Sequence, residues 1–388
     1  MTERERILGG VIYCVKVFLA VRIGLFVLSI LAVNLIPVHE LVFLDFPGWP
    51  AHTPTPGMHN MFTALERQDA LWFLRIATIG YGEADGSAAF FPLYPMLIRG
   101  LSFVIGGHEL AAALLISNLS FLGGLCVLFF LTTSELSESA ARRTVVYLAV
   151  FPTAFFFFAP YSESLFLFLA VTAFWAARRS KWPLAALAGA LAGATRGVGV
   201  FIAVALALEA LTQSREKRGG LPGKLAWSAA AGLGTVAYLA FQRMLSGDWL
   251  APLTQQGTWQ REEMLPWVTI GRATREAFTL ISQPGGGVFL IDWLVVTPVL
   301  AAAVYALFRF RPAYGSYTWA SLLVPLTLVF EPRPFLSMPR FALPLFPVFW
   351  SFAAWTEKRR VSHQVVLGVS AAGLCLLTLL FVNWYPIF

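Results

Sequence analysis

One carboxylate, Asp69, stands among aromatic side chains in the segment 66–95, directly after the first long apolar run. If residues 64–79 form a helix, Asp69 shares one face with Trp72 and Ile76, because side chains three and four positions apart are neighbours. A carboxylate on an apolar face can take the proton from an attacking hydroxyl. The same residue could equally be a solvated carboxylate on a loop helix. Its aromatic surroundings favour chemistry on a lipid-borne substrate.

Aromatic residues and prolines follow this helix in the run FFPLYP, residues 90–95. Gly80 and Gly82 end the helix, and a polar turn separates it from the run. Two prolines among aromatic rings predict a stiff, extended segment at the level of the lipid headgroups. We expect residues 96–106 to form a helix that lies at the membrane interface.

The composition shows what kind of chain must position these residues. With 58% hydrophobic residues, 13% charged residues and a mean hydropathy of +0.70, a water-soluble globule would lack polar surface. The net charge of +7 does not indicate nucleic acid, because the basic residues form short clusters between apolar runs. Cys14, Cys126 and Cys375 lie in apolar runs without metal-binding spacing, so neither a disulfide framework nor a zinc site is expected.

Apolar runs long enough to cross a membrane recur along the whole chain. The block 183–211 has Arg196 at its centre, and we expect two short helices with Arg196 at the turn near the outer face. The count is then about eleven crossings in a single integral membrane domain, 1–388. The remaining predicted spans are 14–36, 109–132, 144–160, 162–178, 225–245, 287–308, 313–330, 340–355 and 363–384.

The basic clusters predict the orientation. If the N-terminus is cytoplasmic, every cluster of two or more lysines and arginines falls on the cytoplasmic side, and the C-terminus is extracytoplasmic. The first apolar run is then a retained span rather than a cleaved signal peptide. Three outer loops result, 37–108, 246–286 and 331–339, whereas the inner loops are short. A protein that elaborates only one face is expected to act on that face.

Several of these residues resemble those of a known family. The matching segments are DALWFLRIATIGY at 69–81, AFFPLYP at 89–95, APYSES at 159–164, ATR at 194–196 and RF at 340–341. They resemble the PIG-V family, the glycosylphosphatidylinositol mannosyltransferase II relatives within the GT-C superfamily. The sequence departs from the usual pattern at Gln68, where such proteins commonly have tryptophan.

The resemblance implies an all-α polytopic membrane protein of the GT-C type, with interfacial helices in a long first outer loop. It implies transfer of mannose from a polyprenyl-phosphate-linked donor to a lipid-anchored glycan or glycolipid, by an inverting displacement with Asp69 as the base. Membrane lipids are the other expected partners. Short loops and a chain of 388 residues favour a prokaryotic plasma membrane.

The leaving phosphate needs a cation, and Arg196, Arg333 and Arg340 are the candidates near the outer face. Each could instead extend to lipid headgroups. Glu163 is expected to orient the acceptor or pair with an arginine, or to be a simple turn carboxylate. Asp248 either covers the sugar or belongs to an ordinary interfacial loop. The other expected substrate contacts are Gln68, Trp72, Tyr81, Phe91 and Tyr94.

The histidines, including His39, His52 and His59, show no paired spacing, so we expect neither a catalytic metal nor a cofactor. The competing function is a lipid-linked sugar translocase or transporter without transferase chemistry. That class favours paired halves and charges deep inside several spans, whereas these charges concentrate at one face. A ligase acting on a lipid diphosphate would be expected to carry more outer arginines.

Overall fold

The computed structural model describes residues 3–39, 63–217, 220–385 and 387. His52, His59 and the stretch 40–62 of the expected first outer loop lie outside the described residues. The chain divides into two compact units. The first comprises Met1–Tyr81, Pro92–Phe168 and Trp355–Ile387, and the second comprises Gly82–Phe91 and Leu169–Ala354.

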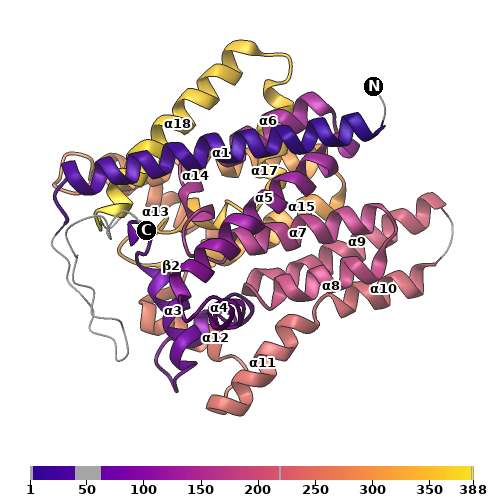
Figure 1. Cartoon of the computed structure of the whole chain (residues 1–388), viewed down its shortest axis with the longest axis horizontal. Helices are drawn as coiled ribbons and strands as arrows, with labels where there is room; N and C mark the ends of the chain where they lie inside the picture. Colours follow the sequence, from indigo (N-terminus) through magenta and orange to yellow (C-terminus); the bar gives the residue numbers. More distant parts are fainter. Residues whose placement is uncertain (1–2, 40–62, 218–219, 386, 388) are drawn as a thin grey trace. The chain divides into compact units, whose positions relative to one another are not determined.

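The first unit is built around the long helix α1, which packs against α5, α6 and α18 (Figure 1). The short helices α3 and α4 pack on each other and on α5. The boundaries of these elements are α1 Glu3–Leu35, α3 Asp69–Ile79, α4 Leu93–Val104, α5 Glu109–Glu135, α6 Glu138–Ala149, the 3₁₀ turn η2 Ala154–Phe157 and α18 Arg360–Val382. Helix α7, Glu163–Arg178, begins in this unit and continues into the second, and α17, Phe346–Thr356, ends in the first.

A group of stacked phenylalanines forms the core of the first unit. Phe121 and Phe157 stack at 4.4 Å between ring centres, and Phe155 lies 4.7 Å from Phe381. The predicted span at 144–160 is wrong, because α6 ends at Ala149. Pro152 has no N–H to donate and disfavours helical geometry in the residue before it, so the chain turns there into η2.

The second unit is also helical. Helix α9 packs against α8, α10 and α15, and α14 packs against α13 and α15 (Figure 1). Its elements are η1 Ser87–Ala89, α8 Trp182–Gly193, η3 Gly197–Gly199, α9 Val200–Lys217, α10 Leu221–Ala230, α11 Leu233–Ser246, α12 Ala251–Thr254, η4 Gln255–Trp259, β1 Arg261–Glu263, α13 Pro266–Thr279, α14 Gly287–Arg309, α15 Pro312–Thr327, β2 Leu328–Phe330 and α16 Met338–Phe341.

Two predictions for the second unit have opposite outcomes. The block 183–211 does form two helices that pack on each other, α8 and α9, and Arg196 lies at the break between them. The single span at 225–245 is wrong, because the chain breaks at Gly232 into α10 and α11. Both halves pack on α8, and Gly234 approaches Ala190 so closely that a Cβ would collide with its carbonyl.

Proline and strand pairing shorten two further predicted spans. The span at 313–330 ends at Thr327, because Leu328–Phe330 pairs antiparallel with Arg261–Glu263 as the two strands β2 and β1. The span at 340–355 begins as α17 only at Phe346, after Pro344. The stretch 90–95 is not extended throughout, since α4 begins at Leu93 with proline tolerated in its first turn.

The long apolar helices make this an integral membrane protein. Five segments among the described residues are long and apolar enough to cross a bilayer: Glu3–Leu35, Glu109–Glu135, Gly197–Glu216, Gly287–Arg309 and Arg360–Val382. These five confirm the runs predicted at 14–36, 109–132, 287–308 and 363–384 and the second half of the 183–211 block. The expected total of about eleven crossings is not confirmed.

Candidate active site

Asp69 is the first residue of α3 and is half-buried. The positive end of the helix dipole favours a negative charge at this position. Trp72, Phe73 and Ile76 are buried, as the helical spacing predicted. The predicted helix start at residue 64 is wrong, so the carboxylate stands at the helix terminus rather than in the middle of an apolar stripe.

The residue before Asp69 explains where the helix begins. Gln68 has φ 52° and ψ −120°, and residues other than glycine rarely adopt a positive φ. A regular helix cannot run back through such a residue. The conformation costs on the order of 1–3 kcal/mol, and strain of this kind is concentrated at functional sites. The position at which the sequence departs from the PIG-V pattern is therefore also a strained one.

The buried side chain of Arg67 holds the backbone before Asp69. Its Nε donates to the carbonyl of Val382 at 3.0 Å. Its Nη1 donates to the carbonyls of Thr63 and Glu66 at 2.9 and 3.0 Å. Burial lowers the pKa of Arg67 to about 10, which leaves the side chain charged at neutral pH. Arg67 thus connects the loop that carries Asp69 to the end of α18.

Three segments of the family pattern meet at the same backbone. The hydroxyl of Tyr161 donates to the carbonyl of Arg67 at 2.7 Å. Ser117 donates to the carbonyl of Tyr161 at 3.0 Å and shares a hydrogen bond of 2.7 Å with Tyr94. The ring of Phe73 lies edge-on to Tyr94 at 5.0 Å. Buried tyrosine hydroxyls therefore fix the segment from which Asp69 projects.

Replacing Tyr161 with phenylalanine should slow catalysis without changing substrate affinity. The change removes the hydrogen bond to the carbonyl of Arg67, worth about 1 kcal/mol, and loosens the placement of Asp69. We expect kcat to fall about tenfold with KM nearly constant, because misplacement by a fraction of an ångström weakens the reacting geometry. The matched control is Tyr147→Phe, which removes a buried hydroxyl hydrogen-bonded to Thr356 in the same unit. Equal losses in the two variants would contradict a positioning role.

Glu66 makes the stability of the protein depend on pH. Burial raises the pKa of Glu66 to about 7, although Arg67 opposes the shift. Between its ordinary value of 4.5 and about 7, the folded carboxyl keeps a proton that the unfolded chain has lost. Stability should therefore fall as pH rises through this window, by about 1–2 kcal/mol after discounting for solvent screening.

The substitution Glu66→Gln isolates this effect. Thermal unfolding in detergent should give equal midpoints for the variant and the unmodified chain near pH 4, and a higher midpoint for the variant at pH 8. A difference that stays constant across this range would show that the Glu66 carboxyl does not titrate in it.

Not every residue expected to touch substrate is accessible in the first unit. Tyr94 and Glu163 have no exposed surface, and Trp72 is 1% exposed beneath the guanidinium of Arg75. Glu163 lies in the first turn of α7, where the helix dipole favours its charge. The burial of these residues fits a scaffold around Asp69. Tyr81 is half-buried just beyond the end of α3.

The segment 82–91 is held within the second unit. The hydroxyl of Tyr238 lies 2.8 and 3.1 Å from the carbonyl oxygens of Ala88 and Phe90. The ring of Phe91 packs on Tyr238 at 4.5 Å, and a Cβ on Gly197 would lie 3.2 Å from the Phe91 ring. Phe91 is therefore packed beside the break that carries Arg196.

Three arginines of the second unit surround one aromatic ring. The guanidinium carbons of Arg340, Arg196 and Arg261 lie 5.1, 5.4 and 5.6 Å from the ring centre of Phe341. Three guanidinium groups around one ring give this region a positive charge, which favours an anion. We refer to Arg196, Arg261 and Arg340 as the Phe341 arginine cluster.

The two other expected contacts in the second unit make internal bonds. Arg333 forms a bidentate, buried ion pair with Asp292, with N–O distances of 2.6 and 2.8 Å. Asp248 accepts hydrogen bonds from Thr254 and the backbone of Leu250, which lower the pKa of its carboxyl. Arg333 therefore ties its loop to α14, and Asp248 stabilises the turn in which it lies.

Two residues were missed from the sequence, Arg67 and Arg261. Arg67 stands beside the expected catalytic residue, but its backbone acceptors are invisible in a sequence. Arg261 lies in the segment 246–286, two residues after Trp259 in the run WQREE, and nothing in that run indicated a partner far along the chain.

The part of the chain that the structure describes contains no group of three or more histidine, cysteine, aspartate or glutamate side chains that could hold a metal ion. Of His39, His52 and His59, His39 lies within that part, and its ring lies against the ring of Tyr385.

Comparisons with known proteins give a family and several similar structures. The sequence model of a family described as Mannosyltransferase (PIG-V) matches residues 11–215, just over half of the chain. The match includes Asp69, Tyr161 and Arg196. No curated protein matches the chain.

Two solved enzymes illustrate the structural similarity. ArnT from Cupriavidus metallidurans in the apo state is 15% identical, with a TM-score of 0.48 over 96% of this chain and 76% of that one. The Archaeoglobus fulgidus oligosaccharyltransferase, in a complex with zinc and sulfate, is 12% identical, with a TM-score of 0.41 over 95% of this chain. This chain spans about half the length of the oligosaccharyltransferase, with 53% covered.

Proposed function

The chain belongs to the mannosyltransferase (PIG-V) family, and we propose that it moves mannose from a mannosyl-phosphoryl-polyprenol to a hydroxyl of a lipid-anchored glycan or glycolipid. The observation that carries the proposal is the placement of Asp69. The carboxylate begins a helix, and Arg67 and Tyr161 fix the backbone before it. A rigidly held carboxylate at a helix terminus suits a general base.

The proposed reaction is one displacement with inversion at the anomeric carbon. The acceptor oxygen attacks this carbon while Asp69 takes the proton from the acceptor hydroxyl. The bond between the anomeric carbon and the phosphate oxygen breaks, and its electron pair leaves with the polyprenyl phosphate. No oxidant or further reactant is required.

The leaving phosphate gains negative charge as the glycosidic bond breaks, and we assign its stabilisation to the Phe341 arginine cluster. Arginine stays charged and can present two parallel N–H donors to a phosphate. A single phosphate fits a set of three arginines without a metal ion. Because Arg333 is paired with Asp292, we leave it out of this role.

The membrane orientation belongs to the same proposal. A cytoplasmic N-terminus and an extracytoplasmic C-terminus follow from the basic clusters, and place the segment that contains Asp69 outside. A cysteine introduced by the substitution Glu83→Cys, at an exposed position in the turn after α3, should react with a membrane-impermeant reagent in intact cells. Labelling only after the membrane is opened would reverse this topology. The short inner loops favour a prokaryotic plasma membrane.

The deciding experiment supplies the purified chain in proteoliposomes with synthetic mannosyl-phosphoryl-polyprenol and an extract of membrane lipids. We expect a mannosylated lipid whose anomeric configuration is opposite to that of the donor, identified by mass spectrometry and NMR. Parallel reactions contain GDP-mannose or glucosyl-phosphoryl-polyprenol and should give little product. Movement of the donor across the bilayer without any transfer would support a translocase instead. Transfer from GDP-mannose alone would refute the lipid-linked donor.

A further inference from the structure

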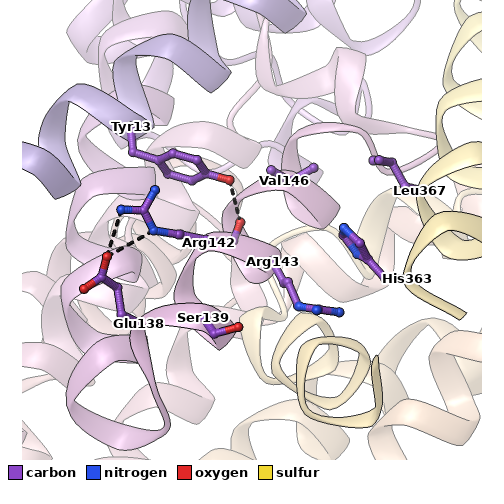
Figure 2. Close-up of a pocket in the computed structure, with 8 residues that line it drawn as sticks. All are labelled: Tyr13, Glu138, Ser139, Arg142, Arg143, Val146, His363 and Leu367. Carbon is purple, nitrogen blue, oxygen red and sulfur yellow. Dashed lines mark hydrogen bonds and ion pairs between the residues drawn. The ribbon is translucent and has the colours of Figure 1, made fainter. Parts of the chain in front are cut away.

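A cavity of about 470 Å³ lies within the first unit, among α1, α6 and α18. Its volume far exceeds the ~30 Å³ share of one water molecule, so it can hold more than a small ion. Asp69 is not among the residues that line it. Figure 2 shows the lining side chains, which are Tyr13, Glu138, Ser139, Arg142, Arg143, Val146, His363 and Leu367.

One wall of the cavity holds an arginine in a fixed position. The guanidinium of Arg142 lies 4.7 Å from the ring centre of Tyr13, whose hydroxyl donates to the Arg142 carbonyl at 3.1 Å (Figure 2). The Nε and Nη2 of Arg142 donate to Glu138 at 3.1 and 2.8 Å. Its Nη1 has no partner among the described residues, so donors remain for a ligand.

A second arginine is fixed by backbone contacts. Arg143 donates through Nη1 to the carbonyl of Thr356 at 2.7 Å and through Nη2 to the carbonyl of Glu357 at 3.3 Å. His363 shares a hydrogen bond of 2.6 Å with Tyr147, which places its ring at the cavity wall. Because these side chains are anchored, the cavity is a built site rather than a gap between mobile groups.

The charge of the cavity favours an anion. The charged side chains that line it are two arginines and one glutamate, Glu138. Arg142, which pairs with Glu138, keeps N–H donors available. The exposed residues Lys358, Arg359 and Arg360 directly precede and begin α18 and add positive charge at the same end of the helix. Each such basic residue near a membrane surface raises the affinity for an anionic lipid about fivefold.

The other part of the cavity is apolar and reaches into the membrane-spanning region. Val146 and Leu367 line it on the side away from Glu138 and Ser139 (Figure 2). Both α1 and α18 are long enough to cross a bilayer. Leu367 lies about 10 Å along α18 from its first residue, at 1.5 Å per residue.

We propose that this cavity binds an anionic phospholipid, with its phosphate at Arg142 and Arg143 and an acyl chain along Val146 and Leu367. A free phosphate ion would use only the polar wall, whereas the lipid uses both. With the orientation proposed above, the lipid belongs to the cytoplasmic leaflet. The site is distinct from the Asp69 segment, and the proposal does not depend on the transfer reaction.

The test compares two substitutions that break the same salt bridge. Arg142→Gln removes a positive charge from the cavity, and Glu138→Gln removes the opposing negative charge. The full chain, purified in detergent, is titrated with dioleoyl-phosphatidylglycerol, dioleoyl-phosphatidylcholine or inorganic phosphate alone. Retained lipid is counted by native mass spectrometry, and the thermal midpoint is recorded in parallel.

We expect phosphatidylglycerol to bind at least tenfold more tightly than phosphatidylcholine. Arg142→Gln should weaken this binding about fivefold to tenfold, whereas Glu138→Gln should leave it unchanged or strengthen it. If both substitutions weakened phosphatidylglycerol binding equally, the loss would come from the broken salt bridge that they share. That result would refute a role for the charge of the cavity. Equal binding of the two lipids would overturn the proposal. Binding of inorganic phosphate as strong as that of phosphatidylglycerol would reduce the site to an ion site.

Discussion

Replacing Asp69 with asparagine should abolish sugar transfer while leaving the protein folded. The amide cannot accept the proton of the attacking hydroxyl, and a positioned general base contributes about 10²–10⁴-fold to rate. We expect kcat to fall by about three orders of magnitude. The change is nearly isosteric, and Asp69 is half-buried at the start of α3, so the thermal midpoint should change little.

Two further substitutions separate the base from the general charge of the loop. Asp69→Glu keeps the carboxylate but displaces it, so part of the activity should remain. Glu83→Gln removes an exposed carboxylate from the turn after α3 and should leave the rate within about twofold. Turnover in Asp69→Asn near that of the unmodified chain would show that another group takes the proton.

The second large effect should come from the Phe341 arginine cluster. Replacing Arg196 or Arg340 with glutamine should lower kcat by about 10²-fold, the usual loss when one donor to a developing anion is removed. Binding of the product polyprenyl phosphate should also weaken. Because the arginines act on one phosphate, the fold-loss in kcat of the double variant should be smaller than the product of the fold-losses of the two single variants.

The affinity for polyprenyl phosphate, measured as product inhibition or by calorimetry, distinguishes this role from that of the base. Asp69→Asn should leave that affinity unchanged, whereas Arg196→Gln should reduce it. The matched control is Arg272→Gln, which breaks half-buried ion pairs with Glu276 and Glu331 in the same unit and should change neither quantity. Unaltered phosphate affinity in every variant of the cluster would remove it from the phosphate site.

Part of the fold could be predicted because a single local property decides it. Long uninterrupted apolar runs became α1, α5, α14 and α18, since only a helix satisfies its own backbone hydrogen bonds in lipid. The break at Arg196 was also predictable, because a charge in the middle of an apolar block is costly. The spans predicted at 144–160 and 225–245 were wrong although the hydropathy of both runs is uniform. A proline interrupts the first, and close packing of a glycine against α8 accompanies the break in the second.

The sequence by itself determined the membrane class, the family pattern and the choice of Asp69 and Arg196. These depend on residue types and spacings within short segments. Only the tertiary structure decided that Asp69 begins its helix, that Arg67 and Tyr161 hold it, and that Arg261 joins Arg196 and Arg340. Such contacts join residues far apart in the chain through backbone carbonyls and aromatic ring faces. Every residue has a carbonyl, and this chain has many aromatic rings. Their partners therefore have no signature in the sequence.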